Sequence, residues 1–203
     1  ILLDPETLYD LLFKHQIECA EFVPVVLRNL IHSFKNTSKN LAFMKVLICA
    51  SDKWYGEDFT DFKHYCNAET QLINSYGLTE ATIDSTYFCE QDVSFSPDQV
   101  IPIGKPFANT TCFILDRYMN PVPIGIPGEL YIGGDGLARG YINQPRLTAE
   151  KYISHPFSKQ PGARLYKTGD RARYSADGTI EFLGRVDLQL IIGALIIEPH
   201  QLQ

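Results

Sequence analysis

The 203-residue sequence lacks several features that would assign it to a particular class of protein. No apolar run approaches the ~18 residues that a membrane-spanning helix needs, and lysine and arginine do not cluster as in a nucleic-acid-binding surface. The N-terminus has no basic stretch leading into an apolar signal segment. The net charge is −6, with the acidic residues scattered. We therefore expect a cytoplasmic protein that binds neither nucleic acid nor membranes.

Cysteine is sparse, and its spacing suggests no pairing. The five cysteines are odd in number and far apart, and no Cys-x-x-Cys pair occurs, which argues against a disulfide framework and against a zinc site. Cys19 and Cys49 lie inside apolar runs, so we expect both thiols to be buried and to behave as small hydrophobic groups. This usage fits a reducing cytoplasm.

Signatures of several enzyme classes are also missing. The glycine-rich segment Gly133–Gly136 does not match the phosphate-loop signature Gly-x-x-x-x-Gly-Lys-Ser/Thr, because no lysine or hydroxyl follows at the required spacing. We expect tight turns and close backbone packing there instead. The five histidines are dispersed, and neither Ser51 nor Ser85 has a recognisable His/Asp partner, so a hydrolase triad is not indicated. No internal repeat or low-complexity linker occurs.

The residues that are present predict an α/β subdomain over 1–97. With 45% hydrophobic residues the chain can bury a sizeable core. Asp4 is placed to cap a first helix that has Pro5 at its first position. Strand and helix patterns then alternate, with strands expected at 19–23, 45–50 and 71–74 and helices at 25–34 and 54–66. This alternation predicts a parallel sheet with flanking helices.

The pattern changes after about Pro97 to short β-rich segments separated by proline and glycine turns. Strands are expected at Thr111–Leu115, Glu129–Ile132 and Thr179–Phe182. The Asp177-Gly178 pair is a β-hairpin signal. We therefore expect a β-rich subdomain, a small barrel or sandwich, over 98–187, followed by a final segment over 188–203.

The segment Asn74–Glu80, with the sequence Asn-Ser-Tyr-Gly-Leu-Thr-Glu, is the most informative stretch of the chain. The Tyr76 ring can stack on a purine, and Gly77 permits a tight backbone reversal. Thr79 can donate to phosphate, and Glu80 can bind Mg²⁺, a hard cation that prefers carboxylate and phosphate oxygens. The segment predicts a nucleotide site.

Two further blocks strengthen this interpretation: Gly128–Tyr141, and Tyr166–Asp170 followed by Gly184–Asp187. In this order and at these spacings, the blocks resemble the adenylation domains of nonribosomal peptide synthetases, whose superfamily includes acyl-CoA ligases and luciferases. The resemblance runs from about Ile17 to Asp187. It implies activation of an amino acid by ATP and Mg²⁺ as aminoacyl-AMP, on an α/β core followed by a small distorted β-barrel. It also implies a phosphopantetheinyl carrier domain and a condensation domain as partners.

The resemblance implies roles for single residues of the nucleotide segment. Tyr76 would stack on the adenine, Asn74 would bond the base edge, and Thr79 would contact the α-phosphate next to Glu80 and its Mg²⁺. Ser75 and Gly77 would complete this part of the site. Taken alone, Tyr76 could equally be a core aromatic residue at a strand end. The family usually has proline where this chain has Leu78, which removes no ligand.

Three residues of the second half of the chain are implied in the same site. Asp170 would accept both ribose hydroxyls, since a carboxylate suits a diol, although a Gly-Asp pair by itself more often caps a turn. Arg185 would reach the ribose or the phosphates as a fixed cation. Phe182 stands where the family often has tyrosine, so the ring is kept and a hydroxyl contact is lost.

The resemblance also assigns a pocket for the substrate side chain, with six positions: Glu21, Ile48, Ala50, Ser75, Ile83 and Asp84. Two carboxylates among apolar walls would be costly to bury unpaired, and a cationic side chain would compensate them. We therefore expect ornithine or another basic amino acid, with lysine and arginine next. If Glu21 points to solvent and Asp84 bonds only backbone, a neutral polar or aromatic amino acid would fit instead.

Parts of the resembled architecture have no counterpart in this sequence. A triphosphate-covering loop and an aspartate for the substrate amino group are expected upstream of Ile1, and a lid lysine beyond Gln203. We therefore expect the isolated chain to turn over weakly or not at all. Asp187 is the expected hinge residue, and the resemblance implies that 188–203 holds the hinge and the start of the C-terminal lid. The segment 190–197 after it carries no charge, and Ile191 stands where the family has lysine.

Two other functions remain open. One is an acyl- or aryl-CoA ligase of the same superfamily, although the Asn-x-Tyr-Gly-x-Thr-Glu string and the Leu-Ala-Arg-Gly-Tyr string favour the peptide-synthetase branch. The other is a non-catalytic interaction module that keeps the fold, for which the charge-free segment 190–197 is the best support.

Overall fold

The computed structural model describes residues 4–89, 93–186, 190–192 and 195–197. Most of these residues divide into two compact units. The first contains 4–74, 89 and 93–101, and the second contains 75–88 and 102–186. The strand β3 (Gln71–Tyr76) passes from the first unit into the second. The subdomain boundaries expected from the sequence remain a prediction.

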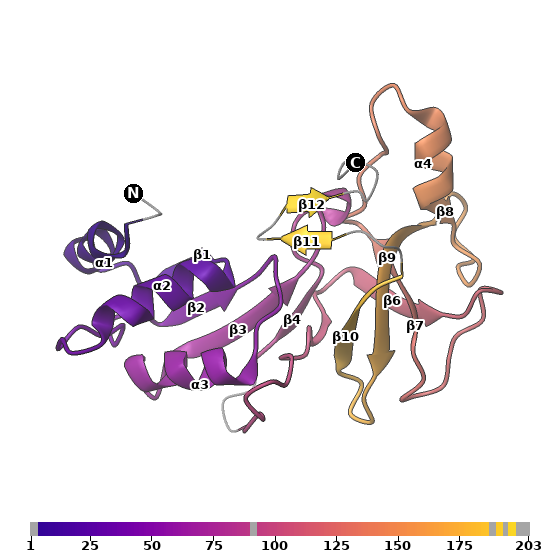
Figure 1. Ribbon diagram of the computed structural model, residues 1–203. Helices are drawn as coiled ribbons and strands as arrows, with labels where there is room; N and C mark the ends of the chain where they lie inside the picture. The colour runs from indigo at the N-terminus through magenta and orange to yellow at the C-terminus, as the bar shows by residue number, and fades with distance from the viewer. Residues whose placement is uncertain (1–3, 90–92, 187–189, 193–194, 198–203) are drawn as a thin grey trace. The chain divides into compact units, whose positions relative to one another are not determined.

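The first unit alternates helices and strands, as the sequence predicts. Its elements up to β3 are α1 (Pro5–Lys14), β1 (Cys19–Phe22), α2 (Pro24–Phe34), β2 (Val46–Cys49) and α3 (Gly56–Tyr65). β1 pairs with β2, and β2 with β3, all in parallel, with Glu21 opposite Ile48 and Cys49 opposite Asn74. Figure 1 shows these three strands side by side. Parallel pairing of strands joined by helices is the expected α/β arrangement.

Local signals in the sequence explain where the first helices begin. Asp4 is the N-cap of α1, and its carboxylate accepts a hydrogen bond from the backbone N–H of Thr7 at 3.1 Å. Pro5 and Pro24 occupy the start of α1 and α2, where the missing N–H costs nothing. The residues that these elements bury form an apolar core that includes Leu27, Leu30, Phe34, Leu47, Trp54, Phe62 and Leu72.

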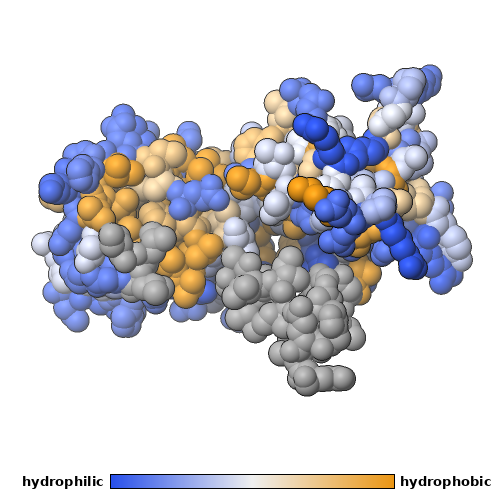
Figure 2. Space-filling model, turned by 90° about the horizontal axis from the view of Figure 1, so that it is seen from above, coloured by the Kyte–Doolittle hydropathy of each residue, from blue (hydrophilic) through white to orange (hydrophobic). Residues whose placement is uncertain are grey.

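The surface of the first unit carries apolar residues among charged ones. On the face seen in Figure 2, hydrophobic residues (orange) lie between hydrophilic ones (blue). The exposed apolar side chains of this unit include Leu11, Phe13 and Val25. The expectation for Cys49 is confirmed, because its thiol is buried. The expectation for Cys19 is wrong: this thiol is exposed, because it falls on an exposed position of the alternating pattern of β1.

The second unit is β-rich. β4 (Thr86–Phe88) and β5 (Lys105–Pro106) pair antiparallel. A separate antiparallel sheet has the order β10-β9-β7-β6, with β8 paired to β9. Its strands are β6 (Thr110–Leu115), β7 (Gly128–Gly134), β8 (Tyr152–Ser154), β9 (Arg164–Tyr174) and β10 (Ile180–Arg185), and the helix α4 (Pro145–Lys151) precedes β8.

The predicted hairpin at Asp177-Gly178 is confirmed. β9 and β10 pair antiparallel across it, with Tyr174 opposite Ile180. The Ser175 N–H donates to the Thr179 carbonyl at 2.8 Å, and Gly178 has a φ of 82°, a value that glycine adopts without strain. The turn aligns the far ends of both strands, so that Asp170 faces Arg185.

Two buried clusters hold the second unit together. One contains Ile103, Ile114, Leu130, Ala172 and Ile180, and the other contains Leu115, Tyr131 and Leu165. The sheet is therefore packed on side chains from all its long strands. The distorted barrel that the resemblance implies remains a prediction.

The last described strands are β11 (Leu190–Ile192) and β12 (Leu195–Ile197), which form a two-stranded sheet of their own. The expected hinge at Asp187 lies outside the described residues. Among the described residues, none of the helices is both long enough and apolar enough to span a membrane.

Candidate nucleotide site

The loop that follows β3 reverses the chain within a few residues. The Ser85 N–H donates to the Tyr76 carbonyl at 2.8 Å, and the Ile83 N–H donates to the Leu78 carbonyl at 3.2 Å. A Cβ on Gly77 would lie 1.7 Å from the carbonyl oxygen of Ile83. The close approach of two backbone segments, rather than an unusual φ, therefore requires glycine at this position. The expected reversal at Gly77 is confirmed.

The tip of this loop is strained. The short 3₁₀ helix η1 (Thr79–Ala81) is followed by two residues in the left-handed region, Thr82 at φ 60° and Ile83 at φ 66°. Both are β-branched, a type for which this region is a clear outlier. The Ile83 side chain is 68% exposed. Strain of this kind is concentrated at functional sites.

The second unit brings three predicted nucleotide residues into direct contact. The Tyr76 hydroxyl donates a hydrogen bond to the Asp170 carboxylate at Oδ2. Arg185 Nη1 lies 3.0 Å from the other carboxylate oxygen, Oδ1, and 2.9 Å from the Thr168 carbonyl. These residues are separated by 94 and 15 positions in the sequence, so the contact is a product of the fold.

This cluster is rigidly held. The Asp170 N–H donates to the Thr168 hydroxyl oxygen at 2.9 Å, and that hydroxyl donates to the Leu130 carbonyl at 2.7 Å. The side chains of Asp170 and Arg185 are 3% and 10% exposed, so their ion pair is almost fully buried. Burial, and then the negative charge of Asp170, hold the pKa of Tyr76 well above its ordinary value. Its phenol is therefore a neutral donor at physiological pH.

The Tyr76 ring is half-buried. It packs against the cluster around Ile114 and Leu130, and its centroid lies 6.3 Å from that of Phe182 at an interplanar angle of 36°. An aromatic ring fixed by its hydroxyl and by packing is a preformed platform for stacking. Each Asp170 carboxylate oxygen has two lone pairs, and a carboxylate is an acceptor suited to the two hydroxyls of a diol.

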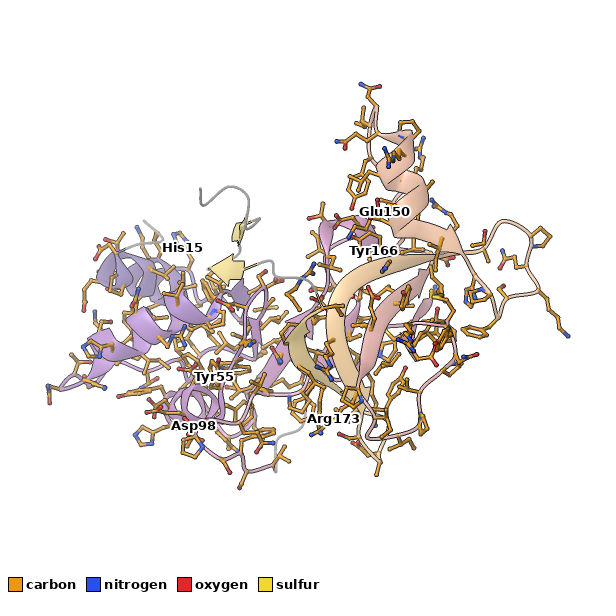
Figure 3. The ribbon with its side chains drawn as sticks, turned by 45° about the vertical axis from the view of Figure 1, so that its right-hand side comes forward. His15, Tyr55, Asp98, Glu150, Tyr166 and Arg173 are labelled. Atoms are coloured by element: carbon orange, nitrogen blue, oxygen red, sulfur yellow. The ribbon has the colours of Figure 1, made fainter. Side chains whose placement is uncertain are left out.

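Glu80 and Thr79 lie at the loop tip and differ in their contacts. Thr79 is exposed, and no hydrogen bond joins its side chain to any other described residue. One oxygen of Glu80, Oε1, accepts a hydrogen bond from the Tyr141 hydroxyl at 2.7 Å. The Tyr141 hydroxyl also lies 3.2 Å from that of Tyr166, a residue of β9 that is labelled in Figure 3. Burial raises the pKa of both phenols.

The residues present fit a magnesium ion that arrives with a nucleotide. No group of three or more His, Cys, Asp or Glu side chains that could hold a metal occurs among the described residues, so this part of the chain builds no all-protein cage. Mg²⁺ is usually bound through one or two carboxylates together with substrate phosphates and water. Glu80 supplies one such carboxylate at an exposed loop.

The six positions of the predicted side-chain pocket divide between the two units. In the first, Glu21 is exposed on β1 opposite the half-buried Ile48 of β2, and Ala50, just after β2, is buried. In the second, the Ser75 hydroxyl donates to Asp84 Oδ1 at 2.5 Å, and Ile83 precedes Asp84. Three of the six predicted positions therefore belong to each unit. The pocket that would contain all six remains a prediction.

Asn74 is engaged in the first unit. Its side chain is buried, and its Nδ2 donates to the Ile101 carbonyl at 3.2 Å. This bond ties the end of β3 to the segment before β5. The predicted contact of Asn74 with the adenine edge remains a prediction.

Comparison with known proteins shows the family of the chain. A family described as "AMP-binding enzyme" matches residues 1–142. The chain belongs to this family. It is 41% identical over 203 residues to tyrocidine synthase 3 of Brevibacillus parabrevis and 39% identical to gramicidin S synthase 2 of Brevibacillus brevis, covering 100% of this chain in both cases. It spans only 3% and 4% of those two proteins.

Solved structures that are similar to this chain include nonribosomal peptide synthetases. The chain is similar to the synthetase FmoA3, with a TM-score of 0.82 and 30% identity, covering 90% of this chain and 19% of that one. It is also similar to PA1221, a synthetase protein containing adenylation and PCP domains, with a TM-score of 0.85 and 26% identity over 98% of this chain and 39% of that one. The likeness extends across both units of the chain.

The sequence reasoning missed the tyrosines around Glu80. Tyr141 and Tyr166 belong to the two blocks that carry the family resemblance, and that position could have indicated a role in the site. Tyr152, whose hydroxyl donates to the Glu80 carbonyl at 3.3 Å, lies outside those blocks. Only the pairing of β8 with β9, where Tyr152 faces Tyr166, brings it into the group.

Proposed function

We propose that this chain is part of an amino-acid adenylation domain and holds the adenosine of ATP. In the proposed reaction, a carboxylate oxygen of the amino acid attacks the α-phosphorus of ATP. The bond from that phosphorus to the bridging oxygen breaks, and pyrophosphate leaves with the electron pair. The products are aminoacyl-AMP and pyrophosphate. Such a reaction needs alignment and charge neutralisation more than covalent help from the protein.

The observation that carries the proposal is the contact of Tyr76, Asp170 and Arg185 in the second unit. A stacking platform and a diol-binding carboxylate side by side suit the adenine and the ribose of one nucleoside. Arg185 pairs with this carboxylate at 3.0 Å and helps to orient it. Membership of the AMP-binding family supports the same assignment.

Mg²⁺, when bound, would neutralise charge on the phosphates, and Glu80 is the side chain that we assign to it. Thr79 is assigned to the α-phosphate, since its hydroxyl is exposed at the loop tip. Both residues lie in η1, which begins three residues after Tyr76. A nucleoside stacked on Tyr76 would therefore direct its phosphates toward this loop.

Calorimetric titration of the 203-residue chain with AMP tests the proposal. Asp170→Ala and Asp170→Asn should weaken binding by about 100-fold or more, because two hydrogen bonds to a charged acceptor are lost or reduced, each contributing about 1.5–3 kcal/mol. Asp98→Ala, at an exposed turn of the first unit labelled in Figure 3, is the matched control and should bind as wild type.

Two outcomes contradict the proposal. If the folded wild-type chain binds no AMP, the non-catalytic interaction module is the better interpretation. If the three variants bind AMP equally, the ribose is held elsewhere. Asp170→Asn keeps the volume of the side chain, so it separates loss of binding from loss of folding, which circular dichroism monitors.

We extend the proposal to a basic amino acid as the substrate: ornithine, lysine or arginine. Two of the six pocket positions predicted from the sequence, Glu21 and Asp84, are carboxylates, and an opposite charge on the substrate side chain would interact favourably with them. Asp84 already accepts a hydrogen bond from Ser75, which holds it in a fixed orientation. A substrate ammonium would carry the complementary positive charge.

Exchange of labelled pyrophosphate into ATP, by the protein to which this chain belongs, tests the substrate class. Ornithine, lysine or arginine should drive the exchange faster than leucine or phenylalanine. Exchange that ignores all three basic amino acids would show that the pocket is not built for a cation. Exchange driven by fatty or aromatic acids alone would indicate an acyl- or aryl-CoA ligase.

We also propose that the activated amino acid passes to the thiol of a phosphopantetheinyl carrier domain beside a condensation domain. The similarity to a synthetase protein with adenylation and PCP domains supports this assignment. The similarity to tyrocidine synthase 3 over the full length of the chain supports it as well.

A further inference from the structure

Three tyrosines surround Glu80 in the second unit. Tyr141 bonds the carboxylate itself, whereas Tyr152 bonds only the backbone carbonyl of the same residue, at 3.3 Å. The third, Tyr166, lies 3.2 Å from the Tyr141 hydroxyl. The rings are in mutual contact, with centroids 5.8 Å apart for Tyr141 and Tyr152 and 5.0 Å apart for Tyr152 and Tyr166. The half-buried Glu80 carboxylate of the loop thus contacts a packed group of aromatic side chains.

The backbone of the loop is attached to the same region. The Ala138 N–H donates to the Glu80 carbonyl at 2.9 Å, and the Thr82 hydroxyl donates to the Gly136 carbonyl at 2.6 Å. A Cβ on Gly136 would lie 3.0 Å from the Ala81 carbonyl oxygen, so glycine allows this close approach. The segment Gly136–Tyr141, which we call the clamp, therefore holds both the backbone and the side chain of Glu80.

The clamp is itself anchored. Arg164 donates to the carbonyls of Ala138 and Arg139, at 2.9 Å each, and its guanidinium lies over the Tyr152 ring, 5.1 Å from the centroid. The Tyr141 N–H donates to the Thr148 hydroxyl of α4 at 2.9 Å. Tyr141 is thus held at both its backbone N–H and its hydroxyl. This restricts rotation of the Glu80 side chain that the hydroxyl contacts.

We infer that Tyr141 is a positioning residue that orients the Glu80 carboxylate for a magnesium-bound nucleotide. This inference rests on the proposed function. A hydrogen bond from a phenol to a carboxylate is charge-assisted and strong. It fixes the orientation of Glu80 through Oε1 without removing its negative charge. Hydrogen bonds of this type to a ligating carboxylate contribute to metal affinity, and their loss typically costs 10–100-fold.

The test is the effect of Mg²⁺ on the affinity of the 203-residue chain for α,β-methylene-ATP, a nucleotide that cannot be turned over at the α-phosphate. The dissociation constant is measured by calorimetry with excess Mg²⁺ and again with EDTA. In Tyr141→Phe, the tightening caused by Mg²⁺ should fall about tenfold, while the dissociation constant in EDTA stays at the wild-type value.

Tyr152→Phe is the matched control. It makes the same chemical change in the same aromatic group, but removes a bond to the backbone of Glu80 and not to its carboxylate. Its Mg²⁺-dependent tightening should remain close to that of wild type. In a Glu80→Gln background, Tyr141→Phe should have no further effect on the tightening, because a positioning residue acts only through the residue that it positions.

The outcomes separate this inference from the proposed function. If wild type binds the nucleotide more tightly with Mg²⁺ and Tyr141→Phe does the same, the inference is wrong and the proposed function stands. If Tyr141→Phe weakens binding equally in EDTA, Tyr141 only maintains the fold, and the inference is again wrong. If wild type does not bind the nucleotide, the proposed function fails, and the inference fails with it.

Discussion

At the scale of single residues, Gly77 occupies a position that leaves no room for a side chain. Its Cα lies so close to the backbone of Ile83 that a Cβ would overlap the carbonyl oxygen, at 1.7 Å. A flexible side chain could move away from such an overlap, but a backbone carbonyl in a closed loop cannot. The loop that carries Thr79 and Glu80 therefore depends on this glycine.

Gly77→Ala should lower the free energy of unfolding by more than about 3 kcal/mol, at the upper end of the range for overpacked sites. Gly162→Ala is the control, because Gly162 has a φ of 78° and no neighbouring atom within 4 Å of an added Cβ. It should cost only about 1 kcal/mol, the strain of a side chain in the left-handed region. Urea denaturation measures both, and equal losses would show that the overlap at Gly77 is relieved.

The residue types of the nucleotide site could be predicted from the sequence, but their contacts could not. The motifs indicated Tyr76 and Asp170 because their chemistry suits adenine and ribose. That the two side chains bond each other depends on the antiparallel pairing of β9 with β10 and on the packing of Tyr76 against the sheet. Tyr152 escaped notice for the same reason, since no local signal reports which strand lies beside β9.

At the scale of elements, the loop between β3 and β4 combines strain with exposure. Thr82 and Ile83 both have positive φ, and the Ile83 side chain is largely exposed. Neither feature favours folding. Isoleucine at this position is better explained by contact with a substrate than by stability.

Ile83→Gly should therefore raise the free energy of unfolding by about 1 kcal/mol, because glycine adopts the left-handed conformation without strain. It should also change which amino acids drive pyrophosphate exchange in the protein to which the chain belongs. Gln16→Gly, at a φ of 48° next to the end of α1, is the control. It should leave the choice of amino acid unchanged. An Ile83→Gly variant with unaltered selectivity would remove Ile83 from the pocket.

Elements with strong local signals were predicted well. The capped start of α1, the apolar strand β2 and the turn between β9 and β10 each have a residue pattern that acts over a few positions. β8 and α4 were not predicted, because α4 has no buried residues and β8 is only three residues long. Their place depends on pairing with β9 and not on their own sequences.

At the scale of the whole molecule, the second unit is rich in buried tyrosines. Burial raises the pKa of Tyr174 from 10.0 to about 12, and its hydroxyl donates to the Cys112 carbonyl at 2.8 Å. Tyr76, Tyr141 and Tyr166 are also shifted upward. When the folded pKa exceeds the unfolded one, the stabilisation is fully present below the unfolded pKa and is lost as pH rises toward the folded pKa.

The free energy of unfolding should therefore fall above about pH 10, where unfolded tyrosines ionise and these folded ones do not. Each shifted tyrosine adds up to about 1.4 kcal/mol per pH unit to the slope. Tyr174→Phe should make the fall between pH 10 and pH 11 shallower by up to this amount, whereas Tyr118→Phe, at an exposed position, is the control. Urea midpoints measured at both pH values give the slopes. Identical slopes in the three proteins would contradict the account.

The most direct measurement of the central claim is photolabelling of the 203-residue chain with an 8-azidoadenine nucleotide, followed by mass spectrometry. If the adenine lies on the ring of Tyr76 while Asp170 holds the ribose, the label should appear at Tyr76 or its immediate neighbours in the loop. Unlabelled AMP should suppress it, and Asp170→Asn should reduce it about as much as it weakens AMP binding. A label that persists in Asp170→Asn, or that lies in α1, α2 or α3 of the first unit, would contradict the proposed site.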